Sequence, residues 1–437
     1  MRTDDDLYLI IKIPTMKRVV VTGLGILAPN AADVNSFKSA LEQGVSGIRH
    51  HKEMEDAGMA CQVGGISDFD NTALQTYLHP NTFKALTSMP IQYMCTAALS
   101  AWLDAGLEIN SENVDWAAGC VIGCSVCDVD QIKDVTRLVD NAELKKLGLR
   151  NIEQLMTSGV GAYVSGLLGL GNHIITNSAA CATGTESILI AYEKIKLGYA
   201  DRMVAGSCEA PSKYIWSNFD NMRLLPRRYN HSPEQASRPF SASAGGFVPG
   251  SGAGALILEN LETAVERGAK IYAEVLGGAV NSGAQRNGGS MTAPNREGVT
   301  RCITKALEQA DTQPETIDLI CGHLTATMAD KIEVSNWSSA LGRKNGSFPY
   351  INSVKSMVGH CLSAAGSIEC VAAVLQLHHQ FVHPNLNCED LHPEITDIID
   401  ESRIATKSIH TDIRKIIKAN FGFGDVNACL VLSKYAN

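Results

Sequence analysis

Short apolar, β-branched runs alternate along this chain with segments in which apolar side chains recur every three or four residues. The runs predict strands and the periodic segments predict helices. The predicted strands are Arg18–Thr22, Cys120–Gly123, His173–Thr176, Arg202–Ala205, Gly254–Glu259, Ile271–Leu276, Leu319–Gly322, Pro349–Ser353 and Ala428–Leu432. The predicted helices are Thr183–Leu197, Gly298–Ala310 and Ala364–His378. This alternation favours an α/β protein with helices layered on sheets.

The chain also contains a faint internal repeat. A glycine-ended strand, VVVTGLG from Val19, is echoed by AEVLGG from Ala273. A strand, turn and helix, TNSAACATGTES, is echoed by INSVKSMVGHCLSAAGS. The repeat predicts two α/β halves, residues 16–265 and 266–437. Residues 1–15 are interpreted as an N-terminal extension ahead of Met16.

Composition and charge narrow the class of protein. The net charge of -9 over 437 residues argues against nonspecific nucleic-acid binding, which needs a basic surface. No apolar run reaches the ~18 residues of a membrane span, and three acidic residues precede the apolar stretch near the N-terminus, unlike a secretory signal. The 13 cysteines are scattered among small and apolar residues. They indicate reduced thiols and a cytoplasmic location.

One cysteine stands in a setting that suits a nucleophile. The segment SAACATGT around Cys181 follows an apolar strand and opens a helix, and its small residues allow a sharp turn. Backbone N–H groups and the helix dipole at a helix N-terminus favour a thiolate, which can accept an acyl group. Taken alone, a buried structural cysteine is the simpler interpretation.

Two histidines change this balance. His323 ends a predicted strand and is followed by hydroxyl residues and by Asp330 and Glu333. His360 follows VKSMVG at the equivalent place in the second half. Because a duplicated fold brings such strand ends together, His360 is expected to face Cys181. A single histidine after a strand is usually structural, but two of them with this cysteine predict a shared site.

A series of motifs gives the chain a resemblance to a known family. The motifs are VVVTGLG, SAACATGT, SRPF followed by GGFVPGSGAG, GAKIYAEVLG, HLTATMADKIE, VKSMVGHCLSAAGSIE and FGFGDVNACLVL. From about Met16 to Leu432 the sequence resembles the elongating β-ketoacyl-acyl-carrier-protein synthases of the thiolase-like superfamily. The resemblance implies a duplicated thiolase-like fold layered α-β-α-β-α, with helices between and outside two sheets.

The same resemblance implies catalytic roles. Cys181 would be the nucleophile that accepts the acyl group from the carrier protein. His323 and His360 would support malonyl decarboxylation, with their N–H groups binding the thioester oxygen as it becomes an enolate. Lys355 and Glu369 match the family's supporting charged pair, in which Lys355 tunes the histidines.

Further matches concern substrate binding. The backbone N–H groups of Cys181 and Phe423 would form the oxyanion hole, and the Phe423 side chain would gate the acyl pocket. Thr325 and Thr327 match hydroxyls that bind the phosphopantetheine arm, although by themselves they could equally be strand-end turn residues.

The implied reaction is the decarboxylative Claisen condensation of malonyl-acyl-carrier protein with an enzyme-bound acyl thioester. An alternative is a polyketide- or polyene-type ketosynthase, paired with a non-identical subunit. A second alternative is a catalytically silent scaffolding subunit, against which the intact Cys–His–His set argues. The family implies an acyl carrier protein as partner and a homodimer, with partner residues near the acyl pocket. It implies no metal or organic cofactor, because the carrier protein supplies the phosphopantetheine.

Several positions depart from the family pattern. Leu324 stands where a glycine usually follows the first active-site histidine. Ser241, Gly245 and Ser251 stand where acidic residues are common, and Asp425 replaces a glycine of the gating loop. These departures suggest the hypothesis of a specialised synthase with an unusual acyl substrate or partner.

Overall fold

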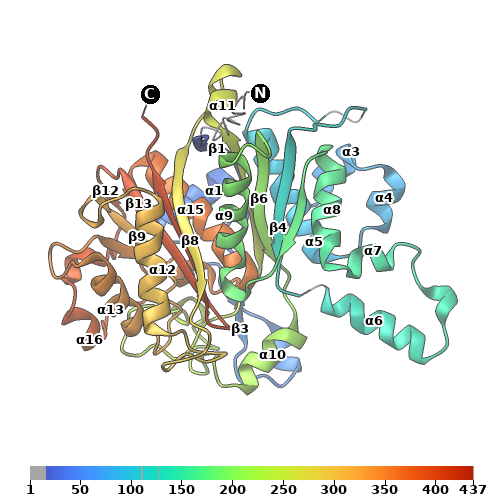
Figure 1. Ribbon diagram of the computed structural model, residues 1–437. Helices are drawn as coiled ribbons and strands as arrows, with labels where there is room; N and C mark the ends of the chain where they lie inside the picture. Colours follow the sequence, from blue (N-terminus) through green and yellow to red (C-terminus); the bar gives the residue numbers. More distant parts are fainter. Residues whose placement is uncertain (1–15, 110–111, 127, 437) are drawn as a thin grey trace, which may run out of the picture.

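The computed structural model of the protein describes residues 16–109, 112–126 and 128–436 (Figure 1). The predicted extension, residues 1–15, lies outside this described part of the chain. Within the described part, no helix has both the length and the apolar character needed to cross a bilayer.

The strands form one large sheet and two small ones. The strands are β1 Val19–Leu27, β2 Ile48–His50, β3 Val63–Gly65, β4 Ala118–Cys124, β5 Ile174–Asn177, β6 Arg202–Glu209, β7 Gly252–Asn260, β8 Ala273–Ser282, β9 Leu319–Cys321, β10 Tyr350–Asn352, β11 Phe381–Val382, β12 Ile409–His410, β13 Lys415–Gly422 and β14 Val426–Ser433. The ten-stranded sheet has the order β10-β9-β13-β14-β8-β1-β7-β6-β4-β5. β2 pairs with β3, and β11 pairs with β12.

The two halves of the large sheet repeat one topology. The first half has the order β1-β7-β6-β4-β5 and the second half β8-β14-β13-β9-β10, so every strand has a counterpart. In each half the first two pairings are antiparallel and the next two are parallel. β1 and β8 join the halves over a short register, from Val19↔Val275 to Val21↔Ala273. The duplication is confirmed, and the two predicted sheets are the halves of one hydrogen-bonded network.

Helices cover the outer faces of the two halves and also fill the space between them. The helices are α1 Val34–Gln43, α2 Lys52–Asp56, α3 Thr72–Tyr77, α4 Pro80–Ala85, α5 Met89–Asp104, α6 Val129–Asp140, α7 Asn151–Leu155, α8 Thr157–Leu168, α9 Thr183–Lys196, α10 Lys213–Asn221, α11 Leu261–Glu266, α12 Arg296–Gln309, α13 Asp330–Leu341, α14 Lys355–Val358, α15 Ala365–His379 and α16 Pro393–Thr396. α9 and α15 contact strands of both halves, α5 and α8 pack against the first half, and α12 packs against the second (Figure 1). These contacts give the layered α-β-α-β-α arrangement.

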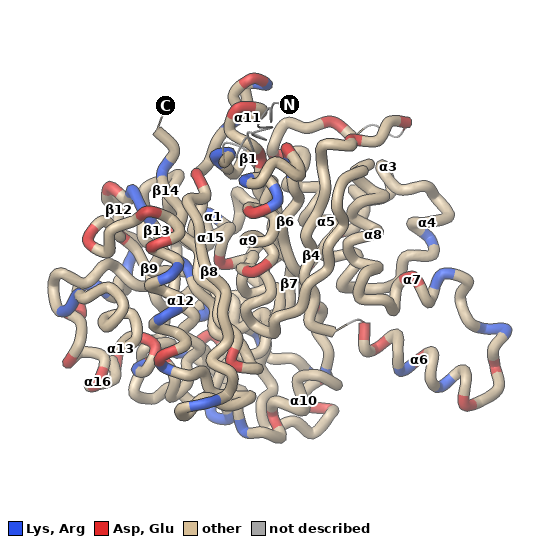
Figure 2. Tube along the Cα trace, viewed as in Figure 1, with Lys and Arg blue, Asp and Glu red and all other residues tan. Residues whose placement is uncertain are grey.

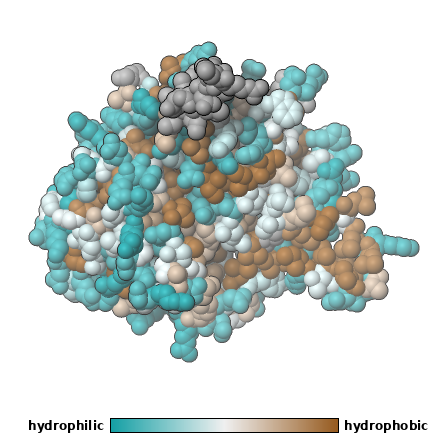
Figure 3. All heavy atoms as spheres, viewed as in Figure 1, coloured by the Kyte–Doolittle hydropathy of each residue, from teal (hydrophilic) through white to brown (hydrophobic). Residues whose placement is uncertain are grey.

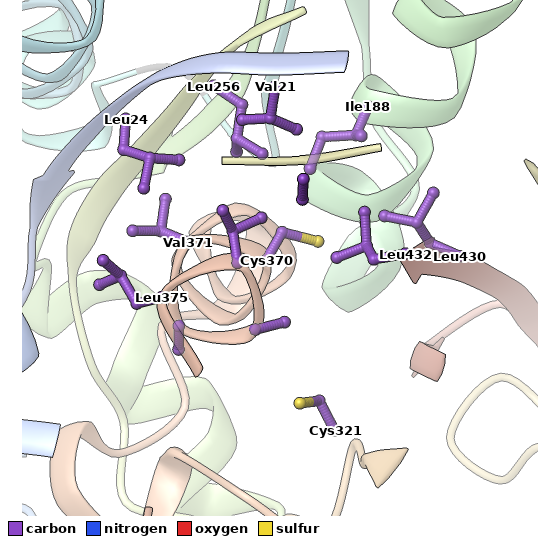
Figure 4. Close-up of a cluster of buried hydrophobic side chains, with 14 of the residues drawn as sticks. Val21, Leu24, Ile188, Leu256, Cys321, Cys370, Val371, Leu375, Leu430 and Leu432 are labelled. Carbon is purple, nitrogen blue, oxygen red and sulfur yellow. The ribbon is translucent and has the colours of Figure 1, made fainter. Parts of the chain in front are cut away.

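The core is centred on α15, whose side chains from Ala365 to Leu377 are all buried. A helix that is buried on every side is expected only where protein encloses it completely. Val371 of α15 packs among residues that include Val21 of β1 and Ile188 of α9 (Figure 4). This packing fixes α9 and α15 against each other, and both helices begin at the site described next.

Candidate active site

A cavity of about 660 Å³ lies at the carboxyl ends of the parallel strands. Ser125 follows β4, His323 follows β9 and Phe423 follows β13, and all three line the cavity. In open α/β sheets, ligands bind at these strand ends. Cys181 and His360 also line the cavity, so the structure brings the predicted nucleophile and both predicted histidines to one surface.

The chain presents Cys181 on a sharp turn between β5 and α9. Ala180 has a φ of 46°, and a single 3₁₀ turn over Ala180–Ala182 leads into α9 at Thr183. The Thr183 hydroxyl accepts a hydrogen bond from the Ala179 N–H at 2.8 Å and donates one to the Ala180 carbonyl at 2.6 Å. The strained residue is thus held by bonds within the turn itself, as predicted for a nucleophile on a sharp turn.

His360 contacts the nucleophile directly. Its Nε2 lies 3.1 Å from the Cys181 Sγ, and its Nδ1 accepts the backbone N–H of Leu362 at 3.3 Å. An Nδ1 that accepts a hydrogen bond carries no proton, so in the neutral ring the proton is on Nε2. His360 therefore presents an N–H donor to the sulfur.

The ring of His323 meets that of His360 edge to face, with centroids 5.2 Å apart and planes at 84°. The Asn420 amide donates to its Nδ1 at 3.0 Å, which again leaves the proton on Nε2. The backbone N–H groups of His323 and Leu324 donate to the Glu333 carboxylate at 2.7 and 2.8 Å. The backbone and ring of His323 are therefore both fixed by hydrogen bonds.

Burial sets the charge states of the three groups. It raises the pKa of the Cys181 thiol to about 11, against the opposing effects of the Lys355 charge and a hydrogen bond from the Phe423 N–H. Burial also lowers the pKa of His360 to about 3, and Lys355 adds to this effect. The pKa of His323 lies well below its ordinary value for the same reasons. Desolvation therefore opposes the thiolate that the helix N-terminus favours, and the Lys355 charge and the Phe423 N–H offset part of this effect.

The predicted charged pair lies buried behind the histidines. The Lys355 ammonium contacts Oε1 of Glu369, with 2% and 4% of the two side chains exposed. Burial would raise the pKa of Glu369, but Lys355 and a second cation, Lys418, bring it below its ordinary value. Sequence reasoning missed both Lys418 and Asn420. The signal was a lysine and an amide alternating with apolar residues in IIKANFG, a pattern that is unusual for a buried strand.

Phe423, the predicted oxyanion-hole and gating residue, lines the cavity together with Cys181. Its backbone N–H donates to the Cys181 thiol, and its ring meets Phe219 edge-on with centroids 6.1 Å apart. A Cβ at Gly422 would lie 3.0 Å from the Cys181 nitrogen, which is tighter than ordinary contact, so glycine lets the two backbones approach this closely without a shift. The N–H groups of residues 181 and 423 are thereby brought next to the sulfur.

Thr325 and Thr327 line another part of the cavity wall, and their hydroxyl oxygens are 3.0 Å apart. Their backbone N–H groups both donate to Asp330, which fixes the turn. They therefore occupy turn positions and also face the cavity, so the two interpretations of the sequence are compatible.

Two of the departures from the family pattern have a structural explanation. Leu324 is fully buried, and its backbone does not adopt the positive φ that would require glycine. Asp425 has a φ of 62° and accepts the backbone N–H groups of Gln285 and Asn295 at 2.9 and 2.8 Å. Its carboxylate ties the gating segment to the loop 283–295, part of which lines the cavity.

Cys181, His323 and His360 also form the one cluster in the described part of the chain whose side chains could together hold a metal ion, with ligand atoms within 4.8 Å of one another. A metal would need a lone pair on each ring nitrogen that faces the cluster. Both imidazoles instead accept hydrogen bonds at Nδ1 and carry their protons on Nε2. With these hydrogen bonds, the Nε2–H groups of the two histidines suit hydrogen-bond donation rather than metal ligation.

Comparison with known proteins agrees with this geometry. The family described as "Beta-ketoacyl synthase, N-terminal domain" matches residues 16–264, and the corresponding C-terminal domain matches residues 272–389. The 3-oxoacyl-(acyl-carrier-protein) synthase 1 of Escherichia coli is 32% identical over 428 residues, which covers 96% of this chain and 99% of that protein. The 3-oxoacyl-(acyl-carrier-protein) synthase 2 of Vibrio harveyi is 33% identical over 425 residues, with the same coverage of each chain.

Solved structures give the same result. A β-ketoacyl synthase from Burkholderia phymatum superposes with a TM-score of 0.88 at 27% identity, over 96% of this chain and 100% of that one. A type II PKS ketosynthase, solved in complex with its acyl-carrier protein, gives 0.83 at 29% identity with the same coverage. With the duplicated fold and the Cys–His–His geometry, these matches show that the chain belongs to the β-ketoacyl synthase family.

Proposed function

We propose that the protein condenses a malonyl unit, delivered on an acyl carrier protein, with an acyl group carried on Cys181. The contact between the Cys181 sulfur and His360, with the His323 ring next to His360 in the same cavity, carries this proposal. The relatives named as 3-oxoacyl-(acyl-carrier-protein) synthases support it.

In the first step Cys181 attacks the thioester of an acylated carrier protein. The new C–S bond forms as the bond to the carrier's sulfur breaks, and the cysteine proton ends on the departing thiol. Because the resting thiol is protonated, the developing thiolate must be stabilised as it forms. The His360 Nε2–H, 3.1 Å away, is positioned to do this.

In the second step the malonyl unit loses its carboxylate as CO₂. The electron pair of the broken C–C bond forms an enolate, and its negative charge develops on the thioester oxygen. Two Nε2–H donors, from His323 and His360, would bind that oxygen. Burial keeps both rings neutral, so they act as donors rather than as acids.

In the third step the enolate carbon attacks the acyl thioester on Cys181. The backbone N–H groups of residues 181 and 423 would hold the oxyanion. When the oxyanion collapses, the C–S bond to Cys181 breaks and the 3-oxoacyl carrier protein is released. The Cys181 thiolate then regains a proton. This route needs no resident metal or organic cofactor, so we expect full activity after treatment with a chelator.

The direct test is intact-mass analysis after incubation with a panel of acyl carrier proteins. We expect the mass of one acyl group on the wild type and none on Cys181→Ala. An unmodified wild type with every carrier tested would refute the proposal and favour the silent scaffolding subunit. Loss of CO₂ from a malonyl carrier protein then tests the second step independently.

A polyketide- or polyene-type ketosynthase is the second candidate. The structural similarity to the type II PKS ketosynthase, and to a structure named the ishigamide ketosynthase/chain length factor with a TM-score of 0.85 at 26% identity, favours it. Co-purification with a homologue that lacks the cysteine would support this candidate, as would failure to elongate saturated acyl carrier proteins. Efficient elongation of saturated primers would instead support fatty-acid synthesis.

The cavity mouth suits a partner that delivers a phosphate-bearing arm. Arg296 lines the cavity and is exposed, and exposed Arg286 and Arg223 each adjoin a lining residue. Positions with Lys or Arg also lie near α10 at the lower edge of the molecule (Figure 2). We propose that this face docks the carrier protein, because the guanidinium groups would attract the arm's phosphate. Arg296→Glu should raise the KM for the carrier-bound substrate. This increase in KM should be smaller at high salt, because salt screens the charges.

We also propose a homodimer in the cytoplasm. Every side chain of α6 is at least partly exposed, and Ile132 and Val139 lie on one face of it. Leu149 and Ile152, which follow α6 in the chain, are also exposed, and Figure 3 shows an apolar surface in the region of α6 and α7. Exposed apolar patches of this kind mark protein–protein interfaces. We therefore expect the Val139→Asp variant to sediment as a monomer in analytical ultracentrifugation. The free thiols throughout the described part of the chain fit a reducing compartment.

A further inference from the structure

Lys418 lies on the central strand β13, where its side chain is completely buried. Its ammonium contacts Oε2 of Glu369 at 2.8 Å and the Thr185 hydroxyl at 3.0 Å, and it also donates to the amide oxygen of Asn420. A buried ammonium is costly unless such partners surround it. Lys418 lies outside the motifs that predict the site, and the three reaction steps above do not use it.

The charged neighbours of Asn420 dictate which way its amide points. An ammonium has only donors, so the amide oxygen must face Lys418, and the Thr185 hydroxyl also donates to that oxygen at 2.6 Å. A carboxylate has only acceptors, so the amide nitrogen must face Glu369, to which it donates at 2.9 Å. The second N–H of the same nitrogen reaches His323 Nδ1 at 3.0 Å.

This orientation fixes the proton of His323. An Nδ1 that accepts an N–H cannot carry a proton itself, so the single proton of the neutral ring is on Nε2, facing the cavity. The other tautomer would need the amide to rotate, which would point its NH₂ group at the Lys418 ammonium and its oxygen at the Glu369 carboxylate. Both contacts would then be repulsive.

We propose that Lys418 is a positioning residue for the condensation, which acts through Asn420 to hold the His323 proton on Nε2 as a hydrogen-bond donor to the substrate oxygen. The proposal rests on the proposed function, because it assigns this donor to malonyl decarboxylation. The positive charge of Lys418 acts in the same direction. Together with burial and the charge of Lys355, it lowers the pKa of His323 and so keeps the ring neutral.

Two substitutions test this arrangement. Lys418→Met removes the ammonium and retains most of the side-chain volume. Asn420→Asp retains the ammonium and replaces the NH₂ group by an oxygen. Because this oxygen also faces the Glu369 carboxylate, we expect the two carboxyl groups to share one proton, which leaves a lone pair that can bond to His323 only through an Nδ1–H. Lys415→Met is the matched control, because it makes the same chemical change on the same strand. The Lys415 ammonium lies 3.5 Å from the Thr312 hydroxyl, outside this network.

The tautomer can be observed directly in long-range ¹H–¹⁵N spectra of protein labelled with ¹⁵N-histidine. Loss of a signal in His323→Ala assigns His323 among the 12 histidines. We expect protonated Nε2 in the wild type and in Lys415→Met, a mixture of tautomers in Lys418→Met and protonated Nδ1 in Asn420→Asp. Malonyl decarboxylation should fall by about 10- to 100-fold in the last two, as when other partners that orient an imidazole are removed.

Acylation of Cys181 separates the possible failures. We expect both variants to acylate at the wild-type rate, because the Cys181 contacts with His360 and Phe423 are unchanged. A His323 that keeps its proton wholly on Nε2 in either folded variant overturns the proposal. A wild type that neither acylates nor decarboxylates refutes the proposed function instead, and leaves the tautomer measurement to decide the role of Lys418 in the structure.

Discussion

The close contact between α9 and α15 should set the distance between the nucleophile and His360. Cys181 lies two residues before α9 begins at Thr183, and His360 lies five residues before α15 begins at Ala365. At Gly184, in the first turn of α9, an added Cβ would lie only 2.3 Å from the backbone nitrogen of Ser367 in α15. Gly184→Ala therefore tests whether this contact positions the two reacting groups.

The size of the effect follows from the contact distances. Ordinary van der Waals contact begins at about 3.4 Å, so the backbones would have to part by the shortfall of about 1.1 Å. Overpacking of this kind costs about 1–3 kcal/mol of stability. A displacement of about 1 Å at reacting groups can slow a reaction about 100-fold. We therefore expect acylation of Cys181 to fall by about two orders of magnitude in a protein that still folds.

The assay is time-resolved intact-mass analysis of Cys181 acylation, combined with thermal unfolding. Gly166→Ala is the matched control, because Gly166 lies within α8 and its Cβ would meet nothing within 4 Å. This control should acylate normally and gain up to about 1 kcal/mol of stability from the higher helix propensity of alanine. Wild-type acylation and an unchanged unfolding midpoint in Gly184→Ala would refute the reasoning.

Three further predictions concern pH, the loop and the substrate arm. The pKa of His360 in the folded protein, about 3, lies below its ordinary value of 6.5, so below pH 6.5 the unfolded chain binds a proton that the folded protein does not. The free energy of unfolding of the protein should therefore fall by about 1.4 kcal/mol per pH unit as the pH drops below 6.5. Urea titrations at pH 7 and pH 5 measure this fall, which should be smaller in His360→Gln. Asp425→Asn loses one of the two charge-assisted hydrogen bonds to the loop 283–295, so we expect thermal unfolding to show a loss of stability of about 1.5–3 kcal/mol. Wild-type stability in this variant would show that the loop does not depend on the charge of Asp425. Thr325→Val should raise the KM for pantetheine-bearing substrates about 5-fold, the effect of one neutral hydrogen bond, whereas lower stability at an unchanged KM would indicate a purely structural role.

The fold was largely predictable because its strands are short, apolar runs separated by clear helical segments. All nine predicted strands are present, although most extend further than predicted, as β8 does to Ser282. The central strand β13 was missed, because Lys418 and Asn420 interrupt its apolar pattern. Those two residues are buried because they bond to each other and to Glu369, a compensation that only the folded arrangement reveals.

The site was predictable in its members but not in its charge states. The motifs identified Cys181, His323 and His360, and the structure brings them together. The opposing effect of desolvation on the Cys181 thiol could not be predicted, because the walls of the cavity cannot be read from the small residues that make the turn. The tautomers of the histidines were also beyond sequence reasoning, since they depend on Asn420 and on the backbone N–H of Leu362.

The duplicated topology explains why groups far apart in the sequence meet. β4 and β9 are counterparts and are followed by Ser125 and His323, while β5 and β10 are counterparts and are followed by the turns that hold Cys181 and His360. Because each pair of strands ends at the same edge of a joined sheet, the loops of both halves converge on one cavity. Divergence between counterpart loops then gives one half the thiol and the other half both imidazoles. Neither half alone contains the reacting set, so the packing of α9 against α15, which holds the halves in register, should be as important for the chemistry as the three side chains themselves.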